Sequence, residues 1–128
     1  MTDPAISQPV LQFIADQIDT VPQLECLLLL YQYDGEGWIA ERVAARIYIA
    51  PQVARGILET LERRGLLAVD GDPARYRFNP DGTFSRELIE QVAAEYQRHL
   101  VPIATFIHSK ASASVREFAR AFDLKRDR

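Results

Sequence analysis

Residues 38–78 constrain the fold of this 128-residue chain most strongly, because they join two short amphipathic helical patterns to a β-hairpin pattern. The first helical pattern covers residues 40–47 and the second covers residues 51–64. Ile49-Ala50-Pro51 interrupts the two patterns, and proline suits the first position of a helix because its nitrogen needs no hydrogen-bond acceptor there. We therefore expect two short helices that are connected by a tight turn.

The second helical pattern separates apolar from polar side chains. At 100° per residue, the face that we expect to pack on the core carries Val53, Ala54, Ile57, Leu58 and Leu61. The opposite, outer face carries Gln52, Arg55, Gly56, Glu59 and Arg63. Gly65 is expected just after the helix end, where the backbone is often left-handed, a conformation that glycine adopts without strain.

The hairpin pattern consists of two short strands, expected from Leu66 to Val69 and from Arg75 to Phe78. Alternate side chains of a strand point to opposite faces. We therefore expect Tyr76 and Phe78 on one face of the second strand, and Arg75 and Arg77 on the other.

This order of elements resembles a winged helix-turn-helix, and in particular small bacterial regulators of the MarR and ArsR type. The resemblance covers about Val21 to Pro80. It implies a mainly α fold, a winged helix-turn-helix with a two-stranded β-hairpin wing and additional N- and C-terminal helices. Members of these groups are usually homodimers that bind pseudo-palindromic DNA operators. Tyr48 and Ala50 depart from the pattern, because these regulators often have Gly and then Ser or Thr there.

In such a fold the outer face of the recognition helix, about Pro51–Arg64, is free to enter the major groove. Glutamine can pair with adenine, and arginine with guanine, through two hydrogen bonds each. The sequence therefore predicts sequence-specific duplex DNA binding by a small transcriptional regulator. The expected DNA contacts are Gln52, Arg55, Glu59 and Arg63 in the groove, Arg42 and Arg46 at phosphates, and Arg75 and Arg77 in the wing, about Leu67–Phe78.

The alternative function is a winged-helix protein–protein interaction module, or a dimeric scaffold, that does not bind DNA. Glu59 lies four residues from both Arg55 and Arg63, so ion pairs could neutralise the outer face. A protein partner would then bind the acidic N-terminal helices or the apolar C-terminal ones. Residues 1–37 hold six acidic residues and no Lys or Arg, whereas residues 38–80 hold seven Arg and five acids. That contrast is modest and leaves both functions open.

Two helices are expected before the motif. Ser7 is the expected N-cap of the first helix, with Pro9 in its first turn. Thr20 and Gln23 have the spacing of a capping box at the start of the second helix. The segment from Leu24 to Tyr33 is apolar on nearly every side, which predicts the most buried helix of the molecule.

A long apolar stripe follows the motif and keeps its phase across Pro102, which predicts one helix with a kink at that proline. A last helix is expected from Ser114. These helices either pack back on the winged helix or form a dimer seam, and we favour a homodimer because closed two-fold symmetry is the commonest oligomer. The expected seam residues are Leu88, Val92, Tyr96, Leu100, Ile103, Ile107, Phe118 and Phe122. Residues 1–80 and 81–128 are expected to form a single domain.

Other function classes find little support in the sequence. There is no glycine-rich phosphate loop and no strand-turn-helix that would hold a nucleophile, so no enzyme activity, catalytic residue or cofactor is predicted. Cys26 is the only cysteine, and His99 and His108 would lie on opposite sides of a straight helix, which argues against a metal site. The longest apolar run, Cys26 to Tyr31, is too short for a membrane span. The N-terminus does not resemble a signal peptide, so we expect a cytoplasmic protein.

Overall fold

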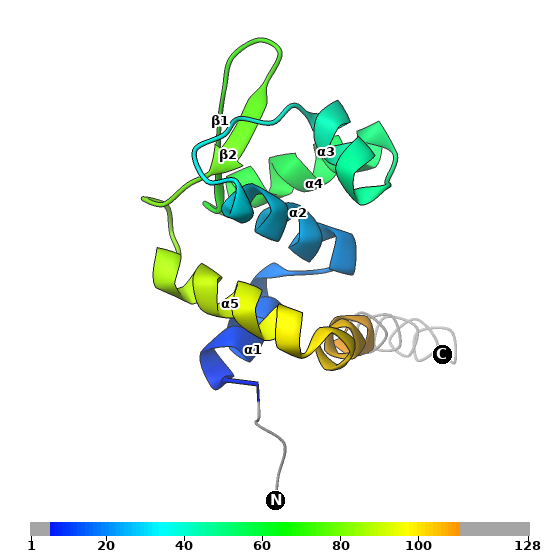
Figure 1. The fold of residues 1–128 in the computed structure, drawn as a ribbon, viewed down its shortest axis with the longest axis vertical. Helices are drawn as coiled ribbons and strands as arrows, with labels where there is room; N and C mark the ends of the chain where they lie inside the picture. Colours follow the sequence, from blue (N-terminus) through cyan, green and yellow to red (C-terminus); the bar gives the residue numbers. More distant parts are fainter. Residues whose placement is uncertain (1–5, 111–128) are drawn as a thin grey trace, which may run out of the picture.

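The computed structural model describes residues 6–110, which form helices and one β-hairpin (Figure 1). In chain order the elements are α1 (Gln8–Gln17), α2 (Val21–Gln32), α3 (Ala40–Ile47), α4 (Pro51–Arg63), β1 (Leu67–Asp70), β2 (Arg75–Phe78) and α5 (Arg86–Arg98). A further helix covers residues 100–110. The fold is a mainly helical winged helix-turn-helix with a two-stranded wing and flanking helices, which confirms the predicted fold class.

Helix α2 lies at the centre of the molecule, with the motif on one side and the terminal helices on the other (Figure 1). It contacts α3, α4 and β2 on the motif side and α5 on the opposite side. Leu24, Leu27 and Leu30 are completely buried, and so is Cys26. The central position of α2 therefore agrees with the prediction that this segment is the most buried helix.

The caps of α1 and α2 are the predicted ones. Ser7 Oγ accepts a hydrogen bond from the Val10 amide at 3.4 Å, and Thr20 Oγ1 accepts one from the Gln23 amide at 3.2 Å. The Gln23 side chain accepts a hydrogen bond from the amide of Asp19, one residue before the cap, at 2.6 Å. These bonds satisfy amide groups at the two helix starts that the helices themselves leave without a partner.

Helices α3 and α4 begin where the sequence predicts, and α4 packs on the core through Ala54, Leu58 and Leu61. The prediction that Val53 also faces the core is wrong, since 47% of its surface is exposed. Val53 lies in the first turn of α4, and α2 packs against the buried stripe that begins one residue later. The apolar stripe of α4 is therefore narrower than its hydrophobic pattern indicates.

The wing is an antiparallel hairpin in which Leu67 pairs with Phe78 and Asp70 pairs with Arg75. Strand β1 begins and ends one residue later than predicted. Tyr76 and Phe78 are buried on the inner face, as the alternation predicts. The sequence did not reveal that Trp38 adds to this sheet: its backbone exchanges two hydrogen bonds of 2.8 Å with Tyr76.

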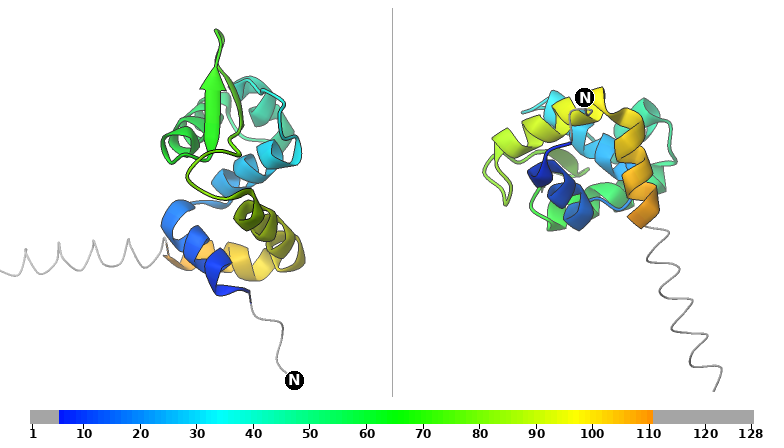
Figure 2. Two further views of the ribbon diagram at one scale, coloured as in Figure 1. Left: turned by 90° about the vertical axis from the view of Figure 1, so that its left-hand side faces the viewer. Right: turned by 90° about the horizontal axis from the view of Figure 1, so that it is seen from below.

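The prediction of one helix kinked at Pro102 is wrong. Helix α5 ends at Arg98, and His99 leaves the helical conformation with φ −129° and ψ 47°. A new helix then covers residues 100–110 and crosses α5 at a steep angle (Figure 2). Pro102 lies in the first turn of this helix, where the missing amide hydrogen breaks no intrahelical bond. The break at His99 therefore allows the chain to turn without losing the apolar stripe.

That turn buries much of the predicted dimer seam within the chain itself. Val92, Ile103 and Ile107 are completely buried, and Tyr96 is nearly so. The assignment of these four residues to a seam between two copies is corrected, because the chain's own helices cover them. Leu88 is half-buried and Leu100 remains 50% exposed. The remaining seam residues, Phe118 and Phe122, and the helix predicted from Ser114, lie outside the described residues.

Lys110 holds the helix of residues 100–110 against α1. Its Nζ donates hydrogen bonds to the backbone oxygens of Ile14, Ala15 and Ile18 at 3.1, 2.7 and 2.5 Å. The last carbonyl groups of a helix have no partner within the helix, and a cation there is favourable to the helix dipole. This contact helps to explain why residues 100–110 fold back on the N-terminal helix.

Candidate nucleic-acid interface

The outer face of α4 is exposed along its length. Its buried stripe fixes the rotation of the helix, so the side chains on the opposite side stand in solvent. Gln52, Arg55, Glu59 and Arg63 are all exposed. At Gly56 a Cβ atom would meet nothing within 4 Å, so this face is open in the middle of the helix as well. No described residue covers the face that the sequence predicts to meet DNA.

The turn before α4 has two unfavourable features. Tyr48, the C-cap of α3, has φ 64° and ψ 49°, in the left-handed region that favours glycine. A non-glycine residue held there costs about 1–3 kcal/mol. Ala50, the N-cap of α4, has no side chain that could accept a hydrogen bond from the first amide groups of the helix. The turn is therefore less stable than a Gly-X-Ser sequence would make it.

Replacing Ala50 by serine is expected to stabilise the fold by about 1 kcal/mol, because a serine at the N-cap accepts a hydrogen bond from the amide of N2 or N3. The expected rise in Tm is roughly 4 °C. Thermal unfolding followed by circular dichroism measures it. Ala45→Ser, an exposed change within α3, is the control and should give no increase. Equal Tm values for the two variants would contradict the capping argument.

Most of the predicted DNA-contacting arginines have partners in the chain. Arg55 Nη2 lies 3.1 Å from Glu41 Oε2, at the start of α3. Arg42 pairs with Glu36 at 2.7 Å and lies over the Trp38 ring at 4.0 Å. In the wing, Arg77 pairs with Asp70 at 2.9 Å. These pairs are exposed, and each is worth roughly 0–1 kcal/mol, so an incoming phosphate can compete for the arginine.

The predicted Glu59 pairs are absent among the described residues. Arg55 pairs with Glu41 instead, and Arg63 donates a hydrogen bond of 3.1 Å to Thr60 Oγ1. Glu41 and Arg55 are fourteen residues apart, so helix periodicity gave no sign of their contact. The sequence identified the electrostatic neutralisation of this face but assigned it to the wrong carboxylate.

Arg46 lies away from the outer face of α4. Its Nη2 donates a hydrogen bond of 3.2 Å to the Tyr33 hydroxyl, and the guanidinium lies over the Tyr33 ring. This hydrogen bond raises the pKa of Arg46. Arg46 also borders a surface groove with Glu25 and Leu28 of α2. It therefore lies on the α2 side of α3, whereas Arg55 and Glu41 lie on the α4 side.

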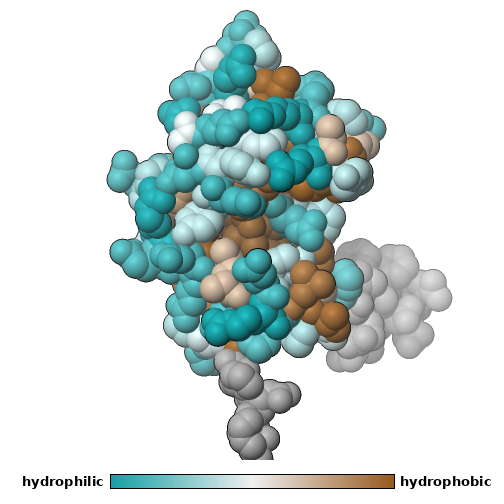
Figure 3. All heavy atoms as spheres, viewed as in Figure 1, coloured by the Kyte–Doolittle hydropathy of each residue, from teal (hydrophilic) through white to brown (hydrophobic). Residues whose placement is uncertain are grey.

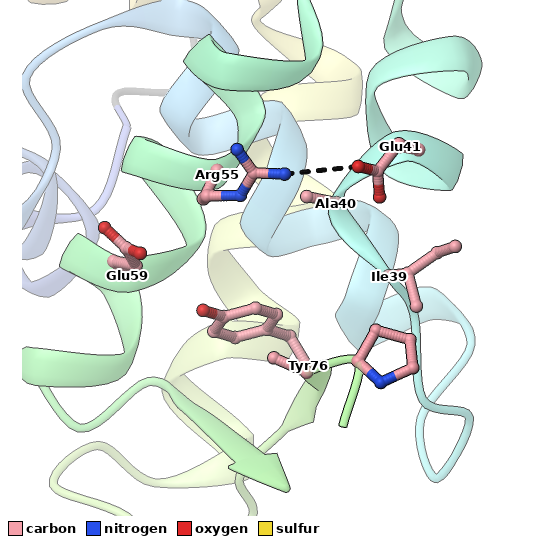
Figure 4. A pocket seen from close by; sticks show the side chains of 8 residues that line it. Ile39, Ala40, Glu41, Arg55, Glu59 and Tyr76 are labelled. Carbon is pink, nitrogen blue, oxygen red and sulfur yellow. Dashed lines mark hydrogen bonds and ion pairs between the residues drawn. The ribbon is translucent and has the colours of Figure 1, made fainter. Parts of the chain in front are cut away.

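A cleft of about 210 Å³ separates α4 from the wing (Figure 4). Arg55 and Glu59 extend from α4, Glu41 from the start of α3, and the Tyr76 ring from β2. The hydroxyl of Tyr76 can donate a hydrogen bond, and burial raises its pKa. The other residues that line the cleft are Ile39, Ala40, Pro73 and Ala74. Sequence reasoning missed Tyr76 and the wing loop, whose approach to α4 depends on the tertiary fold.

Arg75 is exposed at the start of β2 and makes no ion pair with a described residue. The Arg75 Cβ lies close to Gly37, since a Cβ atom added at Gly37 would be 3.1 Å from it. The hairpin thus holds Arg75 beside the loop before α3, with its charge available to a ligand.

Among residues 6–110, no helix has the length and apolarity that crossing a bilayer requires.

No protein-family model matches the sequence of this chain, and no curated protein matches it. The fold, in contrast, is similar to solved structures. A MarR family transcriptional regulator from Silicibacter pomeroyi, SPO1453, has a TM-score of 0.53 at 22% identity, over 90% of this chain and 84% of that one. A MarR family protein from Bacillus stearothermophilus has a TM-score of 0.52 at 21% identity, over 94% and 81%.

A third similar structure, the MarR family protein RV2887 from Mycobacterium tuberculosis, has a TM-score of 0.51 at 20% identity, over 90% of this chain and 80% of that one. At these identities the likeness establishes the fold. The molecule is a winged helix, and its architecture is that of the MarR family structures. The resemblance predicted from the order of elements is thereby confirmed at the level of the fold.

Proposed function

We propose that this protein binds duplex DNA as a small transcriptional regulator. The observation that carries the proposal is the exposed polar face of α4, beside a hairpin whose Arg75 makes no ion pair with a described residue. The α4 helix enters the major groove, where Gln52 and Arg55 contact base edges. Glu59 accepts a hydrogen bond from a cytosine amino group, and Arg63 follows one turn later.

The remaining arginines bind the DNA backbone. Arg42 and Arg46 contact phosphates on the α3 side, and Arg75 and Arg77 contact the backbone or the neighbouring groove from the wing. Such contacts position the protein on the duplex and carry most of the salt dependence of binding. When the complex forms, the ion pairs with Glu36 and Asp70 exchange for backbone contacts, and the pair with Glu41 exchanges for the base contact of Arg55.

A homodimer is part of this proposal, because a two-fold dimer presents two α4 helices to two half-sites about 34 Å apart. The described chain leaves Leu100 and Val101 exposed beyond the end of α5, where Figure 3 shows a hydrophobic patch. A groove of about 500 Å³ between α2 and α5 adjoins Leu100. These apolar surfaces replace the buried stripe as the proposed region of contact between copies.

The second candidate is a protein-interaction module, favoured by the Arg55–Glu41 ion pair, which partly neutralises the outer face of α4. The decisive experiment titrates fluorescein-labelled mixed-sequence and genomic duplexes with the protein over a series of salt concentrations. DNA binding with a steep loss of affinity as salt rises supports the regulator. No binding at 50 mM salt, together with no retention on heparin, supports the interaction module.

Replacing Glu41 by glutamine is expected to tighten DNA binding roughly two- to fivefold, because an exposed ion pair worth about 0.2–1 kcal/mol no longer competes for Arg55. The variant also removes a negative charge beside the phosphates. Fluorescence anisotropy at fixed salt measures the effect. Glu87→Gln is a matched control, since Glu87 is likewise an acid in the first turn of a helix, α5, on the opposite side of α2. Equal affinities of the two variants would show that the Glu41 pair does not oppose DNA.

A further inference from the structure

Tyr48 is a side chain whose presence the fold does not explain. It is 91% exposed, the most exposed of the large hydrophobic residues in the described chain. It also occupies the left-handed conformation in which glycine is unstrained and a tyrosine is strained. Such a conformation is held by the surrounding structure, and the Tyr48 ring itself is almost entirely exposed to solvent.

The backbone around Tyr48 is fixed by the folding of the motif. The amides of both Tyr48 and Ile49 donate hydrogen bonds to the carbonyl oxygen of Ala44, which ends α3 in a left-handed turn. Ile49 then packs on the core, and Ala50 begins α4. The turn needs this conformation whichever residue occupies it, so the tyrosine side chain contributes nothing to the turn itself.

The position of Tyr48 gives the side chain a use. It lies in the turn that joins α3 to α4, at the end of the helix whose first turn holds Glu41, the partner of Arg55. It also precedes Pro51 and Gln52, the first residues of the helix that the proposed function inserts into the major groove. In a helix-turn-helix the N-terminal residues of the recognition helix contact base edges while the preceding helix crosses the sugar-phosphate backbone, so the turn between the two helices lies close to that backbone.

We infer that Tyr48 is a DNA-backbone contact, in addition to the arginines of the proposed function on which this inference rests. The phenolic hydroxyl donates a hydrogen bond to a phosphate oxygen, and the ring packs against the adjoining deoxyribose. Tyrosine makes such contacts to phosphate and sugar, which are independent of base sequence. The ligand is the backbone of duplex DNA.

Two substitutions separate this role from a role in folding. Tyr48→Gly is expected to raise Tm by about 4 °C, because glycine adopts the turn without strain, and yet to weaken duplex binding roughly tenfold. Tyr48→Phe keeps the ring and is expected to leave Tm unchanged and weaken binding roughly threefold. Both are measured by thermal unfolding and by anisotropy with the same duplexes. If Tyr48 served stability alone, its replacement would lower both the Tm and the affinity for the duplex.

Salt and sequence dependence sharpen the test. Because the contact is to the DNA backbone, each variant should lose affinity by a factor that is the same for every duplex sequence. Because tyrosine is neutral, each variant should also keep the salt slope of the parent, whereas loss of an arginine–phosphate contact lowers that slope by about 1. Gln12→Ala, a change at an exposed residue of α1 on the side of α2 away from the motif, is the control and should alter neither Tm nor affinity.

The outcomes distinguish this inference from the proposed function. If the parent binds DNA and Arg55→Ala weakens it while Tyr48→Gly binds as tightly as the parent, the inference about Tyr48 is overturned and the regulator function stands. If the parent does not bind duplex DNA at any salt concentration, both are overturned. A higher Tm of Tyr48→Gly together with weaker duplex binding supports the backbone contact.

Discussion

Replacing Arg55 and Arg75 together by alanine is expected to weaken duplex DNA binding roughly a hundredfold. A bidentate arginine–guanine contact contributes about 1–3 kcal/mol to discrimination, and a phosphate contact adds to that. Arg55 lies at the centre of the exposed face of α4, and Arg75 extends from the wing beside it. The two residues contact different parts of the duplex, so the losses should be nearly additive.

The single variants assign the two roles. Arg55→Ala should change the preference among duplex sequences, whereas Arg75→Ala should weaken all duplexes alike and lower the salt slope by about 1. Arg98→Ala, which removes one positive charge from the last turn of α5, controls for net charge. If Arg98→Ala weakens binding as much as either variant, the protein binds DNA through its overall charge and not through α4 and the wing. Circular dichroism should show unchanged folding for all three variants.

Replacing Trp38 by alanine is expected to destabilise the fold by about 3–5 kcal/mol, as large-to-small changes of buried aromatic residues do. Trp38 is among the largest fully buried side chains, and its ring lies 5.6 Å from that of Tyr33. Its backbone joins the wing through Tyr76. Urea unfolding followed by circular dichroism measures the loss, and hydrogen exchange should show faster exchange of the Tyr76 amide.

Trp38→Phe separates packing from hydrogen bonding. The indole Nε1 of Trp38 is buried without a hydrogen-bond partner among the described residues, and a phenyl ring removes that unsatisfied donor. We expect a loss of about 1 kcal/mol or less, because the smaller ring leaves a cavity that the gain at Nε1 partly offsets. A loss as large as that of the alanine variant would contradict the view that packing of the ring is what matters.

The sequence alone was sufficient for features that depend on neighbouring residues. The caps at Ser7 and Thr20 and the start of α4 at Pro51 were all predictable. A cap bonds an amide three residues away, and helical periodicity repeats within one turn, so both are encoded in a few consecutive residues. The exposed face of α4 follows from the same periodicity.

Only the tertiary structure decided which side chains meet across elements. It paired Arg55 with Glu41 rather than Glu59, and it placed Tyr76 in the cleft beside α4. Such contacts depend on the angle and distance between two elements, which no local pattern contains. For the same reason the turn at His99 escaped prediction: the apolar stripe keeps its phase whether the helix continues or folds back. When the helix of residues 100–110 folds back, Val92, Ile103 and Ile107 become buried in the chain's own core. Burial removes apolar surface from water that a straight, unbroken helix would have left exposed, and this is favourable.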